Sequence, residues 1–261
     1  MTFDSYIVSD TKTSLSMPLA PTPKELKHSK GFKGFTLAET LITLTIIGVI
    51  AALTVPNLLN KYTKHTYVVG LKKAYSRLSN AMKMIPITEG CSAGDYDCAG
   101  MFQEDGKATN IDEQDFEGGN EKKMIYLLSK QFKVQKFCYN YNANTDMECK
   151  KILDIDIFGI ASVGFLLEDG SIFYTNASDN LEIDINGFKG PNKHGRDIFG
   201  FKMATETKNN VQQGQLMPCG SKLEATYTSS QSNYWRNNNC TTERPYIQCT
   251  GRVLEEDAMN Y

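Results

Sequence analysis

Oxygen-bearing side chains gather in one glycine-rich stretch, between residues 184 and 197. Asp184, Asn186 and Asp197 could give a Ca²⁺ ion three oxygen ligands, with main-chain carbonyls completing the shell. Their spacing is not that of an EF-hand, and a well-capped turn without metal would use the same residue types. The sequence leaves both interpretations open and favours the turn. Calcium is the one cofactor that we consider.

Cysteine chemistry is confined to the later part of the chain. Zinc sites usually contain closely spaced CxxC pairs, and the spacings here are wider. We therefore expect an oxidising compartment, with disulfides Cys91–Cys98 and Cys138–Cys149 closing two local loops. A third disulfide would use two of Cys219, Cys240 and Cys249, leaving one thiol. The seven cysteines are at positions 91, 98, 138, 149, 219, 240 and 249.

Acid–base catalysis has few candidates, because the sequence contains three histidines, His28, His65 and His194. Only His194 lies in the part of the chain that would carry a catalytic site, and we expect it to be a solvated turn residue. No G-x-S-x-G, HExxH, P-loop or dinucleotide fingerprint occurs. Carboxylates are plentiful, so a carboxylate glycosidase stays an open alternative. We predict that the protein is not an enzyme.

The average composition hides a strong asymmetry. Over 261 residues the chain is 41% hydrophobic with a net charge of −2, which excludes a disordered chain, a polytopic membrane protein and a general attraction to nucleic acid. The run from Phe35 to Val55 nevertheless contains one charged residue, Glu39. As a helix it would span roughly 30 Å, the thickness of the hydrocarbon core of a bilayer.

This apolar run is not a typical signal sequence. It is longer than the apolar core of a cleaved secretory signal, and Pro56 and Asn57 follow it where a small-residue cleavage pattern would stand. An ordinary signal anchor fits the length. Glu39 argues against that interpretation, because a carboxylate inside an apolar span is costly and usually marks function.

The segment from Lys33 to Glu39, KGFTLAE, resembles the processing site of type IV prepilins and type II secretion pseudopilins. The resemblance implies that a prepilin peptidase cuts between Gly34 and Phe35 and N-methylates Phe35. Glu39 is then the fifth residue of the mature chain, where the family has an acid that pairs with the Phe35 amine of a neighbouring subunit. Because an unpaired buried charge is destabilising, this pairing can select the axial register during assembly. A cut after Gly31 would instead make Glu39 the eighth residue of the mature chain, so we reject that cleavage site.

The resemblance divides the chain into four parts. Residues 1–34 form a leader that is removed, 35–56 a transmembrane and filament-core helix, 57–86 an amphipathic stalk helix, and 87–261 an exterior globular head. Lysines at 24, 27, 30 and 33 favour a cytoplasmic leader. The stalk contains six Lys or Arg and no acid between 57 and 83, so it is either a solvated face or a surface for the acidic heads of neighbours.

The element order predicts an α+β fold. Apolar residues at 68, 71, 75, 78, 82 and 85 mark one seam of the stalk helix. A short helix after Asn120, a hairpin around Asp169-Gly170 and strands near 181–185 and 196–203 follow it. A helix followed by antiparallel strands agrees with the pilin fold that the resemblance implies, with a disulfide-bonded head. The tail from Met217 to Tyr261 is expected to be a surface region.

The predicted function is structural. The protein would be a prepilin-like subunit, cleaved and N-methylated, that assembles into a pilus or pseudopilus. The alternative is a membrane-anchored extracellular receptor or adhesin that does not polymerise. Expected partners are the prepilin peptidase, identical or related pilin subunits, the inner-membrane assembly machinery and membrane lipid, but not nucleic acid. We expect a single-pass inner-membrane protein with its head outside, later at the cell surface. The sequence does not distinguish adhesion, motility, secretion and DNA uptake.

Overall fold

The structure is a computed structural model. It describes residues 34–102, 120–139, 146–153, 163–177, 180–230, 232, 234–237, 240–241 and 246–261. The chain divides into two compact units, Met1–Leu53 and Thr54–Tyr261, and the division falls inside the helix α1 (Leu37–Thr88). The predicted leader, residues 1–34, lies outside the described residues except for Gly34.

The described part of the first unit is the apolar beginning of α1. Its side chains from Gly34 to Ile50 are all exposed. The threonine hydroxyls here bond to the helix's own carbonyls: Thr40 Oγ1 donates to Leu37 O at 2.9 Å, and Thr45 Oγ1 donates to Leu41 O at 2.7 Å. Because these hydroxyls are satisfied within the helix, the segment can lie in an apolar environment without stranded donors.

In the second unit, α1 continues as an amphipathic helix. The predicted seam is confirmed, since Val68, Leu71, Leu78, Met82 and Ile85 are buried. The sixth seam residue, Tyr75, is half-buried and stacks on Phe201, with ring centroids 5.7 Å apart.

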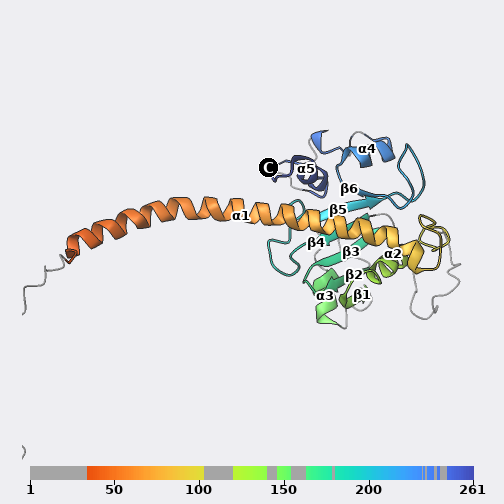
Figure 1. Cartoon of the computed structure of the whole chain (residues 1–261), viewed down its shortest axis with the longest axis horizontal. Helices are drawn as coiled ribbons and strands as arrows, with labels where there is room; N and C mark the ends of the chain where they lie inside the picture. The colour runs from red at the N-terminus through yellow and green to blue at the C-terminus, as the bar shows by residue number, and fades with distance from the viewer. Residues whose placement is uncertain are drawn as a thin grey trace, which may run out of the picture. The chain divides into compact units, whose positions relative to one another are not determined.

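Six strands form one antiparallel sheet in the order β1-β2-β3-β4-β5-β6 (Figure 1). The hairpin predicted around Asp169-Gly170 is β2–β3, and both further predicted strands are present. Strands β1 and β6 are found only in the structure. The bounds are β1 Val134–Tyr139, β2 Val163–Leu167, β3 Ile172–Ala177, β4 Asn180–Asp184, β5 Ile198–Met203 and β6 Leu216–Pro218.

Alternating side chains give the sheet two buried faces. Phe165, Phe173, Phe199 and Phe201 belong to the large core that also contains the α1 seam. Their strand neighbours Leu166, Tyr174 and Ile198 belong to a second core on the opposite face, as the two-residue period of a strand requires. Helix α2 (Asn120–Ser129) contributes to the first core and α3 (Met147–Leu153) to the second. The fold is α+β, a long N-terminal helix with an antiparallel sheet, as predicted.

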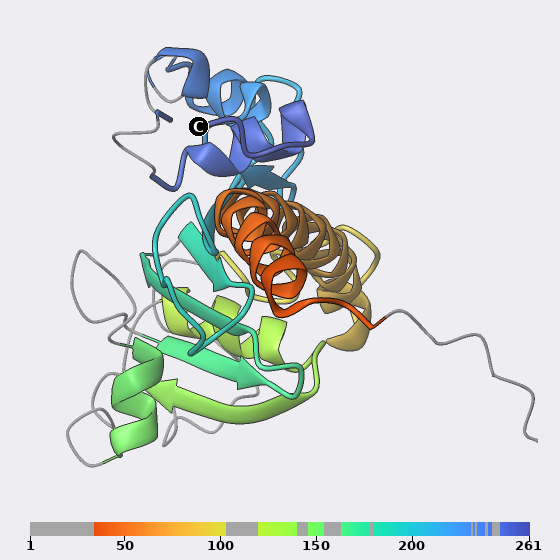
Figure 2. The same cartoon turned by 90° about the vertical axis from the view of Figure 1, so that its left-hand side faces the viewer.

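The expectation of a surface tail after Met217 is wrong. This region folds into α4 (Lys222–Thr228), the 3₁₀ helix η3 (Trp235–Asn237) and α5 (Cys249–Glu256). Trp235, Val253, Met259 and Tyr261 are buried in the large core. Figure 2 shows α3, in green, and the blue C-terminal helices at opposite ends of the sheet. Sparse apolar residues spread over a long, Asn-rich segment gave no periodic pattern from which this packing could be predicted.

The structure closes both local loops predicted from the cysteine spacing, with disulfides Cys91–Cys98 and Cys138–Cys149. The first lies directly after α1, and the second joins β1 to α3. The third disulfide is Cys240–Cys249, at the start of α5. Cys219 is therefore the remaining thiol, and it is buried.

Candidate functional site

The Gly34–Phe35 peptide lies just before the first turn of α1 and is open to approach. Phe35 is 86% exposed, and a Cβ added at Gly34 would meet no atom within 4 Å. Within the described part of the chain, no side chain covers these two residues. This exposure is compatible with proteolytic processing between them, which stays a prediction.

Thr36 and Glu39 form a reciprocal pair at the start of α1. One carboxylate oxygen of Glu39, Oε2, accepts hydrogen bonds from the Thr36 main-chain N–H at 2.8 Å and from the Thr36 hydroxyl at 2.9 Å. The Glu39 N–H in turn donates to Thr36 Oγ1 at 3.2 Å. This is a capping box, which satisfies donors that the first helical turn leaves unpaired. The Thr-x-x-Glu spacing is a sequence signal for this box, which was not among the features predicted above.

The capping box leaves the second carboxylate oxygen for another donor. Both Thr36 donors bond to Glu39 Oε2. Within the described part of the chain, no donor bonds to Glu39 Oε1. A carboxylate can accept bonds at both oxygens at once. Glu39 can therefore order the helix start of its own chain while its other oxygen receives a cation from elsewhere.

Residues 29–55 match a protein family described as "Prokaryotic N-terminal methylation motif". This match supports a likeness of the N-terminal segment to that of type IV pilin-like prepilins. The matched segment contains Gly34, Phe35, Glu39 and the apolar run that follows. No curated protein and no solved structure matches the chain.

The same prepilin segment can anchor the protein in a membrane. Helix α1 is long and apolar enough to cross a bilayer, and its most apolar window has no residue buried in the protein. The placement of the predicted domain boundaries at 56 and 86 stays a prediction, because α1 runs without interruption through both.

The loop between β4 and β5 is held by two buried aspartates. Asp184 Oδ1 accepts hydrogen bonds from the N–H groups of Asn186 at 3.1 Å and Gly187 at 2.8 Å. Asp197 accepts from the N–H groups of Asn192 at 2.9 Å and Lys193 at 2.8 Å. These bonds are those of a capped turn, since the carboxylates bind the loop's own backbone.

The third residue of the predicted calcium site also bonds within the loop. The Asn186 amide donates to the carbonyls of Lys189 at 2.6 Å and Gly190 at 3.3 Å. Among the described residues, no group of three or more His, Cys, Asp or Glu side chains is placed to hold a metal ion. Calcium binding by Asp184, Asn186 and Asp197 stays a prediction, which has to compete with these internal bonds.

Asp184 has an unusual titration behaviour for an aspartate. Burial, together with the nearby negative charge of Asp197, raises its pKa to about 8, against the opposing effect of the two backbone hydrogen bonds. Its Oδ2 atom is buried without a hydrogen-bond partner in the described residues. Asp184 therefore retains a proton in the folded protein near neutral pH.

The expectation of a solvated His194 is wrong. Its Nε2 lies 2.6 Å from Glu182 Oε2, and both side chains are buried. The imidazole also lies against the ring of Tyr246, with centroids 5.9 Å apart. Because the loop folds back over β4, a turn residue that looks exposed in the sequence becomes part of the interior.

Several basic side chains of the stalk already have partners in their own chain. Arg77 and Lys73 pair with Asp169 at 2.6 Å and 3.6 Å, and Lys72 pairs with Asp257. These residues are therefore not available to bind the acidic heads of neighbours without first giving up internal contacts. Lys61 and Lys83 form no ion pair with the described residues.

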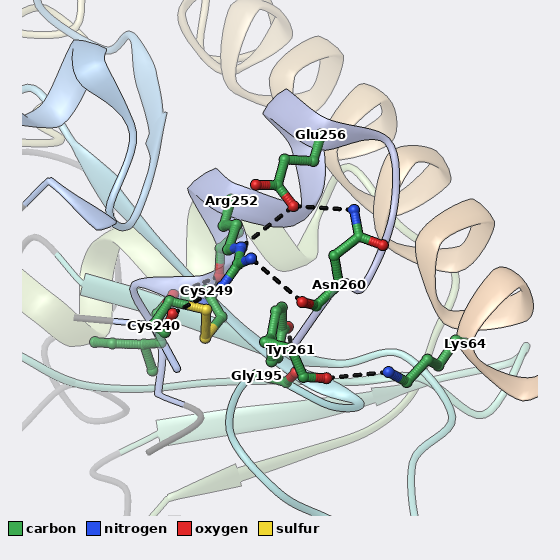
Figure 3. Close-up of a disulfide and its surroundings, with 11 residues drawn as sticks. Lys64, Gly195, Cys240, Cys249, Arg252, Glu256, Asn260 and Tyr261 are labelled. Carbon is green, nitrogen blue, oxygen red and sulfur yellow. Dashed lines mark hydrogen bonds and ion pairs between the residues drawn. A yellow bond between two sulfur atoms is a disulfide. The ribbon is translucent and has the colours of Figure 1, made fainter. Parts of the chain in front are cut away.

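The C-terminal residues tie the loop after β4 to α1, as Figure 3 shows. Lys64 Nζ donates to the main-chain oxygens of Met259 at 2.9 Å and Tyr261 at 3.0 Å. The Tyr261 hydroxyl donates to the Gly195 carbonyl. Arg252 holds this segment through bonds to Asn260 O at 3.3 Å and to the disulfide-bonded Cys240 O at 3.0 Å (Figure 3). The cluster was not predicted from the sequence, because its members come from distant parts of the chain.

Proposed function

We propose that the prepilin is cut between Gly34 and Phe35, methylated on Phe35 and assembled into a pilus or pseudopilus as a structural subunit. The observation that carries the proposal is the wholly exposed apolar beginning of α1, which follows directly on a processing motif. An apolar surface of this extent is unfavourable in water. It requires lipid before assembly and the helices of neighbouring subunits afterwards.

Glu39 gives the assembly a means of selection. Processing at Gly34 would create a charged amine on Phe35, and Glu39 Oε1 is the oxygen that can receive such an amine from a neighbour. In an apolar core an uncompensated charge is strongly destabilising. The most stable axial register would therefore be the one in which Glu39 pairs with the Phe35 amine of a neighbour. The subunit needs no catalytic centre for this role, and we propose that it has none.

The orientation and the partners belong to the same proposal. Three disulfides support an oxidising exterior for residues 87–261. The basic leader then stays on the cytoplasmic side, where the peptidase and the assembly machinery act on the inner-membrane form.

The decisive measurement is the N-terminus of the protein in membranes and in sheared surface filaments. N-methylphenylalanine at position 35 is expected, whereas an uncut Met1 would support the anchored, non-polymerising receptor. Glu39→Ala should be inserted and cleaved but recovered poorly in filaments. Thr43→Ala, a neighbouring polar position in the same segment, is the matched control and should assemble normally.

A further inference from the structure

Two surfaces of the second unit lie far apart along α1. Ile185, which begins the loop after β4, packs on Gly70 of α1, where an added Cβ would meet Ile185 Cδ1 at 3.0 Å. A groove near the C-terminal end of α1 is lined by Met84 and Ile87. At about 1.5 Å per residue, these two places on the helix are separated by about 20–25 Å. The loop and the groove therefore occupy opposite ends of the unit.

The loop exposes an aromatic side chain. Among the described residues of the second unit outside α1, the large apolar side chains left exposed are Met147, at 75%, and Phe188, at 46%. We call residues 186–193 the Phe188 loop. Its flanking Lys189 and Lys193 are exposed, and neither forms an ion pair with the described residues.

The Phe188 loop is held in one shape. The hydrogen bonds of Asp184 and Asp197 fix its two ends, the Asn186 amide crosses it, and the Tyr261 hydroxyl holds Gly195 beside it. A rigid loop loses little conformational entropy when it binds, so its contacts count almost fully toward affinity. The protein therefore orders a segment that exposes an apolar ring.

The groove has a volume of about 830 Å³ and a partly apolar lining. Its large apolar lining residues are Tyr75, Met84, Ile87 and Leu216, of which Met84 and Ile87 are 45% and 49% exposed. This volume is more than sufficient for a phenylalanine side chain and its neighbours.

The walls of the groove are also fixed. One wall is the loop closed by the Cys91–Cys98 disulfide, and the other is formed by Thr207 and the segment from Gln212 to Leu216. Gln213 Nε2 joins the two walls by donating to Asp97 Oδ1 at 2.8 Å. Gly214 lies flat against the Tyr96 ring, since an added Cβ would meet that ring at 2.1 Å.

The Phe188 loop and the groove carry charges of opposite sign, which favours their association. Asp95 and Asp97 are exposed on the disulfide wall, and the Phe188 loop carries Lys189 and Lys193. The groove's own cation, Lys83, lies on the α1 side. An incoming loop would therefore turn its lysines toward the disulfide wall and its aromatic ring toward α1.

We propose that the Phe188 loop of one subunit docks into the groove of the next, with Phe188 on Met84 and Ile87. The inference rests on the proposed function, because it supplies a head-to-head contact for the same filament. The two surfaces are different patches at opposite ends of one unit, so the contact is heterologous. Such a contact repeats into an open helical assembly and does not close into a dimer.

The test is a site-directed cross-link between two co-expressed full-length chains, one with Phe188→Cys and the other with Met84→Cys. Surface filaments are collected, oxidised and run under non-reducing conditions. We expect a dimer band that reducing agent removes. Phe188→Cys combined with Met147→Cys is the matched control, because Met147 is exposed but lies outside the groove. Ile87→Cys provides a second groove position if Met84→Cys lowers expression.

The outcomes separate the two proposals. A dimer at both groove positions, at least fivefold stronger than in the Met147 control, supports the docking. Normal filaments in which groove and control pairs cross-link equally, or not at all, overturn the docking and leave the proposed function intact. A wild-type chain that is cleaved but never forms filaments overturns both. Phe188→Ala should also lower the temperature at which filaments dissociate, whereas Met147→Ala should not.

Discussion

Arg77 of α1 lies 2.6 Å from a carboxylate oxygen of Asp169 in the β2–β3 turn, and so joins the helix to the tip of a hairpin. Ser171 donates to the other oxygen of Asp169 at 2.6 Å, and Lys73 lies 3.6 Å away. Partial burial alone would raise the pKa of Asp169. The hydrogen bonds from Ser171 and Arg77 outweigh it and lower that pKa to about 2.

Asp169→Asn should therefore lower the free energy of unfolding at neutral pH, by about 1 kcal/mol after allowing for solvent screening. The folded pKa lies below the unfolded value of about 4, so wild type has this contribution above pH 4 and loses it between pH 4 and about 2. Thermal unfolding of the detergent-solubilised protein at several pH values measures it. Glu168→Gln, next in the same turn, should change little; equal effects of both substitutions would refute the assignment.

Thr36→Ala should weaken filament assembly without preventing cleavage at Gly34. The substitution removes the hydroxyl of the capping box and about 1 kcal/mol of helix-start stability, so Glu39 is held less firmly. For Thr36→Ala we expect a filament yield between those of wild type and Glu39→Ala. Thr36→Ser keeps the hydroxyl and should give the wild-type yield. The yield of sheared filaments and the mass of the mature N-terminus are the measurements. Equal yields from Thr36→Ala and wild type would show that the capping box has no part in assembly.

Removing the Cys240–Cys249 disulfide should destabilise the C-terminal cluster. Replacing both cysteines by serine releases the segment that Arg252 binds, and loss of a short disulfide-closed loop costs about 2–3 kcal/mol. Thermal unfolding should shift by several degrees, whereas Cys219→Ala should have a smaller effect. Thiol titration of the denatured wild-type chain should give one thiol; a value near seven would contradict the disulfide assignment.

Asp184→Asn should flatten the pH dependence of stability. Since burial raises the pKa of Asp184 to about 8, the folded protein holds a proton that the unfolded chain releases above about pH 4. The free energy of unfolding of wild type should therefore fall between pH 4 and 8, by an amount on the order of 2–5 kcal/mol. Asparagine keeps the acceptor for Asn186 and Gly187 but cannot ionise. Asp184→Ala should be less stable at every pH, and a variant as pH-dependent as wild type would refute the assignment.

Calcium provides a separate test of the same loop. If the backbone hydrogen bonds of Asp184 and Asp197 satisfy the loop, adding Ca²⁺ or EDTA should leave the melting temperature unchanged within about 1 °C. A calcium-dependent rise that Asp197→Asn abolishes would instead establish the metal site predicted from the sequence.

Local signals were sufficient for the processing segment and for much of the sheet. Gly34, Phe35 and Glu39 lie within a few residues of one another, and the Asp169-Gly170 turn lies between two apolar strands, so short windows contain the necessary information. Arg77 and Asp169 are 92 residues apart, and Lys64 and Tyr261 are 197 apart. Such pairs depend on how the helix and sheet pack. His194 was mispredicted for the same reason, since its burial comes from tertiary structure and not from its turn.

The hydrogen bond between Lys64 and Met259 also limits how early a newly synthesised chain can finish folding. Its two ends are separated by 195 residues, which at about 5–20 residues per second take about 10–40 s to synthesise. During this interval the apolar seam of α1 has been synthesised, but the segment that contains Met259 and Tyr261 has not. A newly made subunit therefore passes through a state with an incomplete core, in which chaperones or proteases can act on it before it reaches a filament.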